Sequence, residues 1–156
     1  MSEALKVPTA AVPVGLALAD GSVVKAHLFV PERGLAGRAL ALELAALLDG
    51  DAPFLPAREA GGHVCLYAKH AIAYVTIGFG PGEPESDLQL FDHERSVEVV
   101  LERGPTLVGG LLYTSPADRP RVLDHMNQAG AFLRLWTAET LYVIGKSHVL
   151  RVREIG

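Results

Sequence analysis

Two glycine-rich segments contain residue types that could bind phosphate groups. Gly145-Lys146-Ser147 has the last three residues of a phosphate-binding loop, but such a loop needs a glycine five residues before Gly145, where the chain has Thr140. Residues 78–82 are as rich in glycine as a dinucleotide fingerprint, yet proline and acidic residues follow where a helix should begin. The sequence therefore predicts no phosphate-binding loop and no cofactor.

His63 and Cys65 come closest to a metal-binding pair, because alternate residues of a strand share one face. A zinc site requires three or four ligands, and Cys65 is the only cysteine. Asp124 and His125 could form an acid–base pair, but adjacent residues on a helix point in different directions. The chain also lacks a Gly-x-Ser-x-Gly nucleophile elbow. We therefore predict no metal site, no catalytic residues and no enzymatic activity.

The elements that would position these residues occur twice, in two copies of a β-rich module over residues 12–77 and 95–155. Each copy begins with an alternating strand, a glycine turn and a second alternating strand, a pattern that predicts a hairpin. The offset between the copies shrinks from 83 to 78 and then 77, as expected if strands are kept and loops differ in length. The matched segments are 14–21 with 97–104, 23–29 with 106–112, 52–56 with 130–134, and 64–72 with 141–149.

Each copy also contains a predicted helix between its second and third strands. In the alanine-rich segment 38–48, four leucines share one helical face: Leu40, Leu44, Leu47 and Leu48. The second copy has a shorter pattern in Val122, Leu123 and Met126. The candidates for the start of that helix are Ser115 or Asp118 as N-cap, with Pro116 or Pro120 in the first turn. A third strand near Phe54 or Phe132 and a final apolar hairpin complete each module.

The predicted fold class is mainly β with inserted helices (α+β), organised as a first module over 1–80, a linker over 81–94 and a second module over 95–156. The linker is rich in glycine and proline and carries five acidic residues and no lysine or arginine. The first module has six basic and seven acidic residues, and the second has eight and six. These totals show no strongly basic face of the kind that nucleic-acid binding usually requires.

The composition predicts a cytoplasmic protein. No apolar run reaches the roughly 20 residues that a bilayer span needs, so we expect no membrane association. The N-terminal residues have an acid and two prolines before their apolar part, unlike a signal peptide. A single cysteine excludes an internal disulfide and agrees with a reducing compartment.

The first module ends in Lys69-His70-Ala71-Ile72, which resembles the second signature of bacterial Sm-like proteins of the Hfq or LSm type. The upstream hairpin over residues 14–29 resembles the first Sm signature, with alternating apolar residues and an acidic residue before a glycine. The resemblance covers roughly 45 residues of each copy and excludes the helices. It implies two tandem five-stranded, strongly bent barrels, which in that family commonly assemble edge to edge and often bind RNA.

The resemblance also implies where RNA would bind. The family's uridine pocket uses a Lys-His pair and a stacking Phe, which would correspond to Lys69, His70 and Phe54 in the first copy. In the second copy only Lys146 and Phe132 correspond, because Ser147 replaces the histidine. Two further departures are the helix inside each module, which in the family precedes the first strand, and Tyr67, which is one residue further from the lysine than usual.

Segments 64–67 and 141–144 are apolar on both faces, and a small barrel has only one interior. Their outer faces must therefore be covered by the inserted helix, by the sister module or by another chain. We expect a pseudo-two-fold contact between the modules or an equivalent contact between two chains, and we expect Phe54 and Phe132 to be buried at equivalent positions. The favoured hypothesis is a non-enzymatic adaptor or scaffold subunit that binds a protein partner or itself. The alternative is binding of single-stranded RNA near Lys69 and His70.

Overall fold

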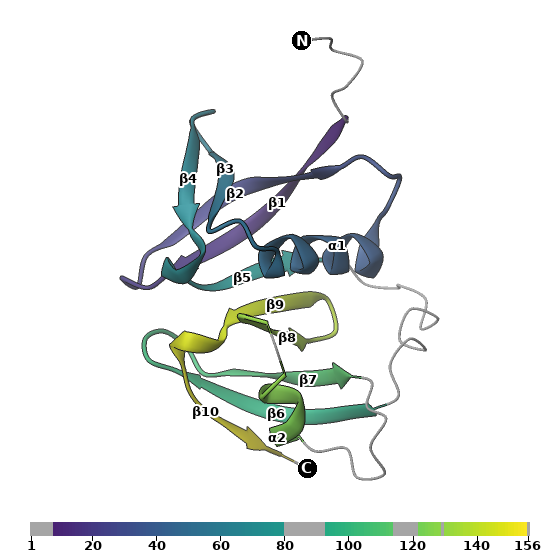
Figure 1. The fold of residues 1–156 in the computed structure, drawn as a ribbon, viewed down its shortest axis with the longest axis vertical. Coiled ribbons are helices and arrows are strands. Elements are labelled where there is room, and N and C mark those ends of the chain that lie inside the picture. The colour runs from purple at the N-terminus through teal and green to yellow at the C-terminus, as the bar shows by residue number, and fades with distance from the viewer. Residues whose placement is uncertain (1–7, 80–92, 114–121, 129, 156) are drawn as a thin grey trace.

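The described part of the chain forms a single antiparallel sheet of ten strands with two α-helices beside it (Figure 1). The structure is a computed structural model and describes residues 8–79, 93–113, 122–128 and 130–155. The first half contains β1 (Thr9–Leu18), β2 (Val23–Pro31), α1 (Gly37–Asp49), β3 (Phe54–Glu59), β4 (Val64–Ala68), the 3-10 turn η2 (Lys69–Ala71) and β5 (Ile72–Gly78). The second half contains β6 (His93–Leu101), β7 (Leu107–Tyr113), α2 (Val122–Met126), β8 (Phe132–Trp136), β9 (Thr140–Gly145), the 3-10 turn η4 (Lys146–His148) and β10 (Val149–Glu154).

The two halves have the same order of elements and the same strand register. Leu16 pairs with Val24 in the first hairpin, and Val99 pairs with Leu107 in the second, at the offset of 83 expected from the sequence. Both halves have a register shift at the matching place in the contact between their first and fifth strands. Each paired strand residue of the first half therefore has a defined counterpart in the second.

The order of strands in the sheet is β10-β6-β7-β8-β9-β5-β1-β2-β3-β4. The halves join through the antiparallel pairing of β5 with β9, hereafter the junction, in which Val75 lies opposite Val143. This pairing leaves β4 and β10, hereafter the free edges, at the two ends of the sheet and at opposite ends of the molecule (Figure 1).

Two sequence predictions about these strands are wrong. The final apolar hairpin does not form: β4 pairs with β3, whereas β5 pairs with β1 and β9, because the turns η2 and η4 redirect the chain between the two strands. The contact between the halves is also not pseudo-two-fold. It joins the fifth strand of one half to the fourth strand of the other, and these strands are not equivalent.

The halves share a hydrophobic core across the junction. The larger cluster of buried side chains comes mainly from the first half, but it includes Phe132, Trp136, Leu141 and Val143 of the second. A smaller cluster lies within the second half and is bordered by Tyr74 of β5. The expectation that the two halves pack against each other is therefore met.

The helix α1 covers this shared core. It forms over an alanine- and leucine-rich segment of high helix propensity, as predicted, and buries Ala41, Leu44, Ala45 and Leu48. The predicted shorter helix is α2, which buries Val122. Its proposed start at residues 115–120 and nearly all of the linker over 81–94 lie outside the described residues. Of the helices in the described part of the chain, none is long and apolar enough to cross a membrane.

Phe54 and Phe132 begin the equivalent strands β3 and β8, as predicted. Only Phe132 is buried, with 7% of its surface exposed, whereas Phe54 is 54% exposed. The prediction that both are buried is wrong for Phe54, because the first half covers Phe132 and no described residue covers Phe54 in the same way.

Candidate functional site

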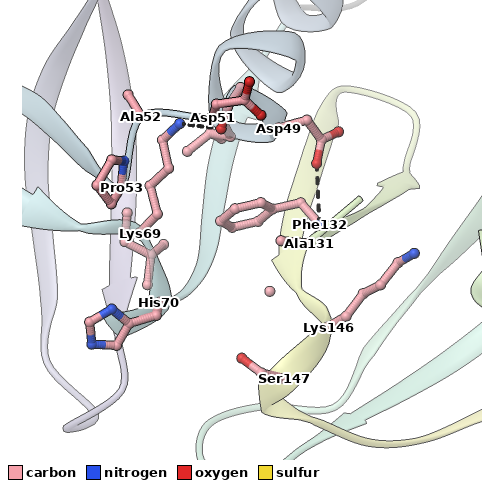
Figure 2. A pocket seen from close by; sticks show the side chains of 14 residues that line it. Asp49, Asp51, Ala52, Pro53, Lys69, His70, Ala131, Phe132, Lys146 and Ser147 are labelled. Carbon is pink, nitrogen blue, oxygen red and sulfur yellow. Dashed lines mark hydrogen bonds between the residues drawn. The ribbon is translucent and has the colours of Figure 1, made fainter. Parts of the chain in front are cut away.

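A cavity of about 370 Å³ lies at the junction, hereafter the junction pocket (Figure 2). Its wall is formed by the loop after α1, the 3-10 turns η2 and η4, and the start of β8. It contains polar groups from both halves: Asp49, Asp51, Lys69, His70, Lys146 and Ser147. The structure therefore brings the Lys-containing segments of both copies to one place, although they are 77 residues apart in the sequence.

The ammonium group of Lys69 binds the end of α1. Its Nζ donates hydrogen bonds to the backbone oxygens of Leu47, at 3.0 Å, and Gly50, at 3.1 Å. Figure 2 shows the side chain of Lys69 reaching toward the loop after α1. The oxygen of Leu47 also accepts the backbone N–H of Gly50, the C-cap residue of α1, and a positive charge is favourable at a helix C-terminus. With 9% of its surface exposed, Lys69 is buried. Its geometry is that of a structural cap.

Lys146 has the equivalent role in the second half. Its Nζ donates to the backbone oxygen of Gln128, 3.0 Å away, just after α2. Lys146 is less buried than Lys69 and makes a single such bond, because α2 is much shorter than α1. In both halves the lysine of the motif holds the inserted helix against the 3-10 turn.

His70, Phe132 and Ser147 form the part of the pocket between the two turns. The ring of Phe132 points into the cavity, and His70 and Ser147 lie on the 3-10 turns η2 and η4 that border it (Figure 2). The backbone oxygen of His70 is 2.8 Å from Nε2 of His148, which ties the two turns together. Phe54 does not line this pocket, so of the two phenylalanines only Phe132 is close to the histidine.

Two carboxylates that sequence reasoning did not single out also line the pocket. Asp49 accepts hydrogen bonds from the backbone N–H of Phe132, at 3.3 Å, and from Nη2 of Arg134, at 3.5 Å. Asp51 follows two residues later and is exposed. The sequence feature that could have identified them is the Asp-Gly-Asp run directly after the predicted helix. With the negative end of α1 beside them, these acids make the pocket poorly suited to phosphate.

A second polar group lies on the β3–β4 hairpin at the free edge. The carboxylate of Glu59 accepts a hydrogen bond from the hydroxyl of Tyr67 and interacts with the thiol of Cys65. The bond from Tyr67 lowers the pKa of Glu59. Burial and the bond to Glu59 raise the pKa of Tyr67 to about 12. The bond to Glu59 also raises the pKa of Cys65, which makes its thiol a weaker nucleophile at neutral pH.

Comparison with known proteins found no family model, no curated relative and no solved structure that matches the chain. Function must therefore be argued from the geometry of the chain alone. The junction pocket holds two carboxylates and two lysines, and both lysines donate to backbone oxygens. The remaining feature that calls for a function is the pair of free edges.

Proposed function

We propose that the chain is a non-enzymatic assembly subunit, made of two Sm-like small β-barrels, that binds its partner by strand addition at the free edges. The observation that carries this proposal is the exposure of large apolar side chains on both edge strands. Leu66 and Val64 on β4 are 69% and 56% exposed, and Leu150 on β10 is 63% exposed.

Such edges are unusual for a protein that acts alone. An edge strand offers a row of unpaired N–H and C=O groups, and proteins that work as monomers usually protect it with charge, proline, bulges or a covering element. β4 has no charged residue and no proline. β10 carries Arg151, Arg153 and Glu154, which allow pairing but restrict it to a complementary strand.

The Sm-like assignment is supported by the repeated order of elements and by the position of Lys69-His70-Ala71-Ile72. This run forms the 3-10 turn and enters the fifth strand, as the resemblance implies. The equivalent turn in the second half occupies the same place, between a fourth strand paired with the third and a fifth strand paired with the first. Proteins of the Sm-like class use their strand edges to assemble, which agrees with the exposed edges of this chain.

The test uses two arginine substitutions at exposed apolar positions. Leu66→Arg places a charge on the free edge, whereas Val23→Arg, at an equally exposed residue of β2, leaves both edges unchanged. Affinity capture from the native cell should recover stoichiometric partners with wild type and with Val23→Arg, and lose them with Leu66→Arg. Retention of every partner by Leu66→Arg would show that the edges do not mediate assembly.

A second candidate function is binding of single-stranded RNA at the junction pocket, favoured by the proximity of His70 to Phe132. We place it second because Lys69 and Lys146 donate to backbone oxygens and the net charge is −4. A labelled oligo-uridine titrated at low and high salt separates the two functions. Binding that is lost in His70→Ala but kept in His63→Ala would favour RNA, and a flat titration at low salt would remove it.

A further inference from the structure

A second cavity, of about 360 Å³ and hereafter the tryptophan pocket, lies where β8 ends. Its lining includes Arg38 from the first turn of α1, Glu94 and Ser96 from β6, Gly110 from β7, and Trp136 from β8. None of these residues lines the junction pocket, which lies at the other end of β8. The tryptophan pocket is therefore a separate place, and it too is built from both halves of the chain.

Trp136 is the residue that points to a ligand. Its side chain packs on the ring of Phe79, with the two ring centroids 5.7 Å apart, and only 7% of its surface is exposed. The indole Nε1 is buried, and no residue accepts a hydrogen bond from it. A buried N–H group without an acceptor costs free energy, and an indole nitrogen can only donate. An acceptor atom on a bound molecule would remove this cost.

The pairing of the strands places the indole beside a carboxylate. Ser96 lies opposite Gly110, and Gly110 lies opposite Trp136. Opposed residues of neighbouring strands share one face of a sheet, as do alternate residues such as Glu94 and Ser96. A Cβ placed on Gly110 would lie 3.2 Å from Oε1 of Glu94. Because Gly110 has no side chain, the Glu94 carboxylate can lie over this strand on the same face as Trp136.

Arg38 contributes a positive charge to the same pocket. Its Cζ lies 5.1 Å from the centroid of the Phe79 ring, on which Trp136 also packs. The guanidinium and the indole are thus held near each other by one phenylalanine. Guanidinium and indole N–H groups together suit a carboxylate, which accepts hydrogen bonds at two oxygens and carries the opposite charge to arginine.

We propose that the tryptophan pocket binds a free α-amino acid. The carboxylate of the ligand accepts from Nε1 of Trp136 and from the guanidinium of Arg38, and its ammonium group donates to Glu94. A pocket with one arginine and one glutamate matches a ligand that carries both charges. A simple carboxylate would be repelled by the glutamate, and a simple amine by the arginine.

This site is independent of the proposed binding at the free edges, because none of its residues lies on β4 or β10. Arg38 belongs to the first half, whereas Glu94 and Trp136 belong to the second. A bound amino acid therefore connects the two halves. Since a ligand that binds only the folded chain stabilises it, we expect the melting temperature to rise with the concentration of the amino acid.

Nuclear magnetic resonance of the full-length chain labelled with ¹⁵N tests the proposal. Trp136 is the only tryptophan, so the spectrum contains a single indole N–H resonance. The probes are the common L-amino acids, titrated one at a time to about 10 mM, a concentration that detects even weak binding. At least one of them should shift the indole resonance saturably and to lower field, as hydrogen bonding of this N–H requires. Its deaminated and decarboxylated analogues, which keep one charge each, should bind about tenfold more weakly or less well still.

Two substitutions identify the groups that bind the ligand. Glu94→Gln, at an exposed residue, should weaken the amino acid about tenfold and leave the affinity for its deaminated analogue unchanged or higher. Glu102→Gln, at an exposed glutamate outside the pocket, is the matched control and should bind as the wild type does. Trp136→Phe keeps an aromatic ring without the N–H group, and it should lose the rise in melting temperature that the ligand gives the wild type.

An indole resonance that no amino acid shifts would overturn the proposal. Equal affinity of wild type and Glu94→Gln for the amino acid would also overturn it, because Glu94 would then take no part. Equal affinity of the wild type for the amino acid and for its deaminated analogue would mean the same. None of these results bears on partner capture by Leu66→Arg, so the failure of this proposal and that of the proposed function are distinguishable.

Discussion

Phe132 and Phe54 occupy the same position in two strands with the same register, yet one is buried and the other is mostly exposed. The difference does not arise within the strands, because both residues begin the third strand of their half. It arises from what lies beside them. The first half covers β8 and β9 at the junction, whereas the described structure places no strand beside β4. The junction thus shows what the free edge would look like if it were paired.

The largest expected difference in stability is between the alanine variants of these two phenylalanines. Phe132→Ala removes a buried side chain that belongs to the shared core, at a cost of about 3–5 kcal/mol. Phe54→Ala alters an exposed side chain and should change stability by about 0.5 kcal/mol or less in the isolated chain. Thermal unfolding should therefore show a fall of about 10 °C or more for Phe132→Ala and little change for Phe54→Ala.

This comparison is best made with both substitutions in the Leu66→Arg background, in which the proposed function predicts that β4 binds no partner strand. Equal losses for the two variants would mean that Phe54 is buried within a single chain. The contrast between junction and free edge would then be wrong.

Substitution of the two motif lysines, Lys69 and Lys146, should also lower stability by different amounts. We expect this difference to be smaller than that between the phenylalanines. Lys69→Met removes two charge-assisted hydrogen bonds, to the backbone oxygens of Leu47 and Gly50, and leaves only the Leu47 oxygen with another donor, so we expect a loss of about 1–3 kcal/mol. Lys146→Met removes a single bond at a more exposed position and should cost less than about 1 kcal/mol. Urea unfolding of the two variants measures the difference. A lysine used mainly for RNA would instead leave stability unchanged in both.

The smallest expected effect is the pH dependence of the stability that the Tyr67–Glu59 hydrogen bond contributes at the free edge. The pKa of Glu59 is lowered mainly by the bond from Tyr67, so this interaction stabilises the fold above the ordinary pKa of a glutamate and is lost as the pH falls through the lower folded value. Tyr67→Phe should therefore lower the melting temperature by a few degrees at pH 7 and by less near pH 3. Melting curves at both pH values, with Tyr142→Phe as control, measure this effect. If the difference in melting temperature between wild type and Tyr67→Phe is as large near pH 3 as at pH 7, the hydrogen bond from Tyr67 is not what lowers the pKa of Glu59.

Local patterns in the sequence were sufficient to predict where these helices and strands form. Alternation around Asp20-Gly21 predicted the β1–β2 hairpin, and the leucine spacing predicted α1 almost to the residue. The repeated spacing also placed Phe54 and Phe132 at the start of equivalent strands. Each of these features depends on residues close together in the chain, where periodicity and turn chemistry act.

Strand partners and burial could not be obtained in the same way. The apolar sequences of β4 and β5 are compatible with a hairpin, and only the 3-10 turn between them sends each strand to a different neighbour. The exposure of Phe54 depends on which half lies beside β3. Lys69 was expected at a uridine pocket, but its long side chain reaches the end of α1, a contact across 22 residues of sequence.

Partner capture with Leu66→Arg and Val23→Arg side by side tests the central claim, that β4 is a binding edge, most directly. Both substitutions place a charge at an apolar residue of similar exposure, 69% for Leu66 and 68% for Val23, but only Leu66 lies on a free edge. We expect Val23→Arg to recover the partners of the wild-type chain and Leu66→Arg to lose them. Retention of the partners by Leu66→Arg, or their loss with Val23→Arg as well, would contradict the account.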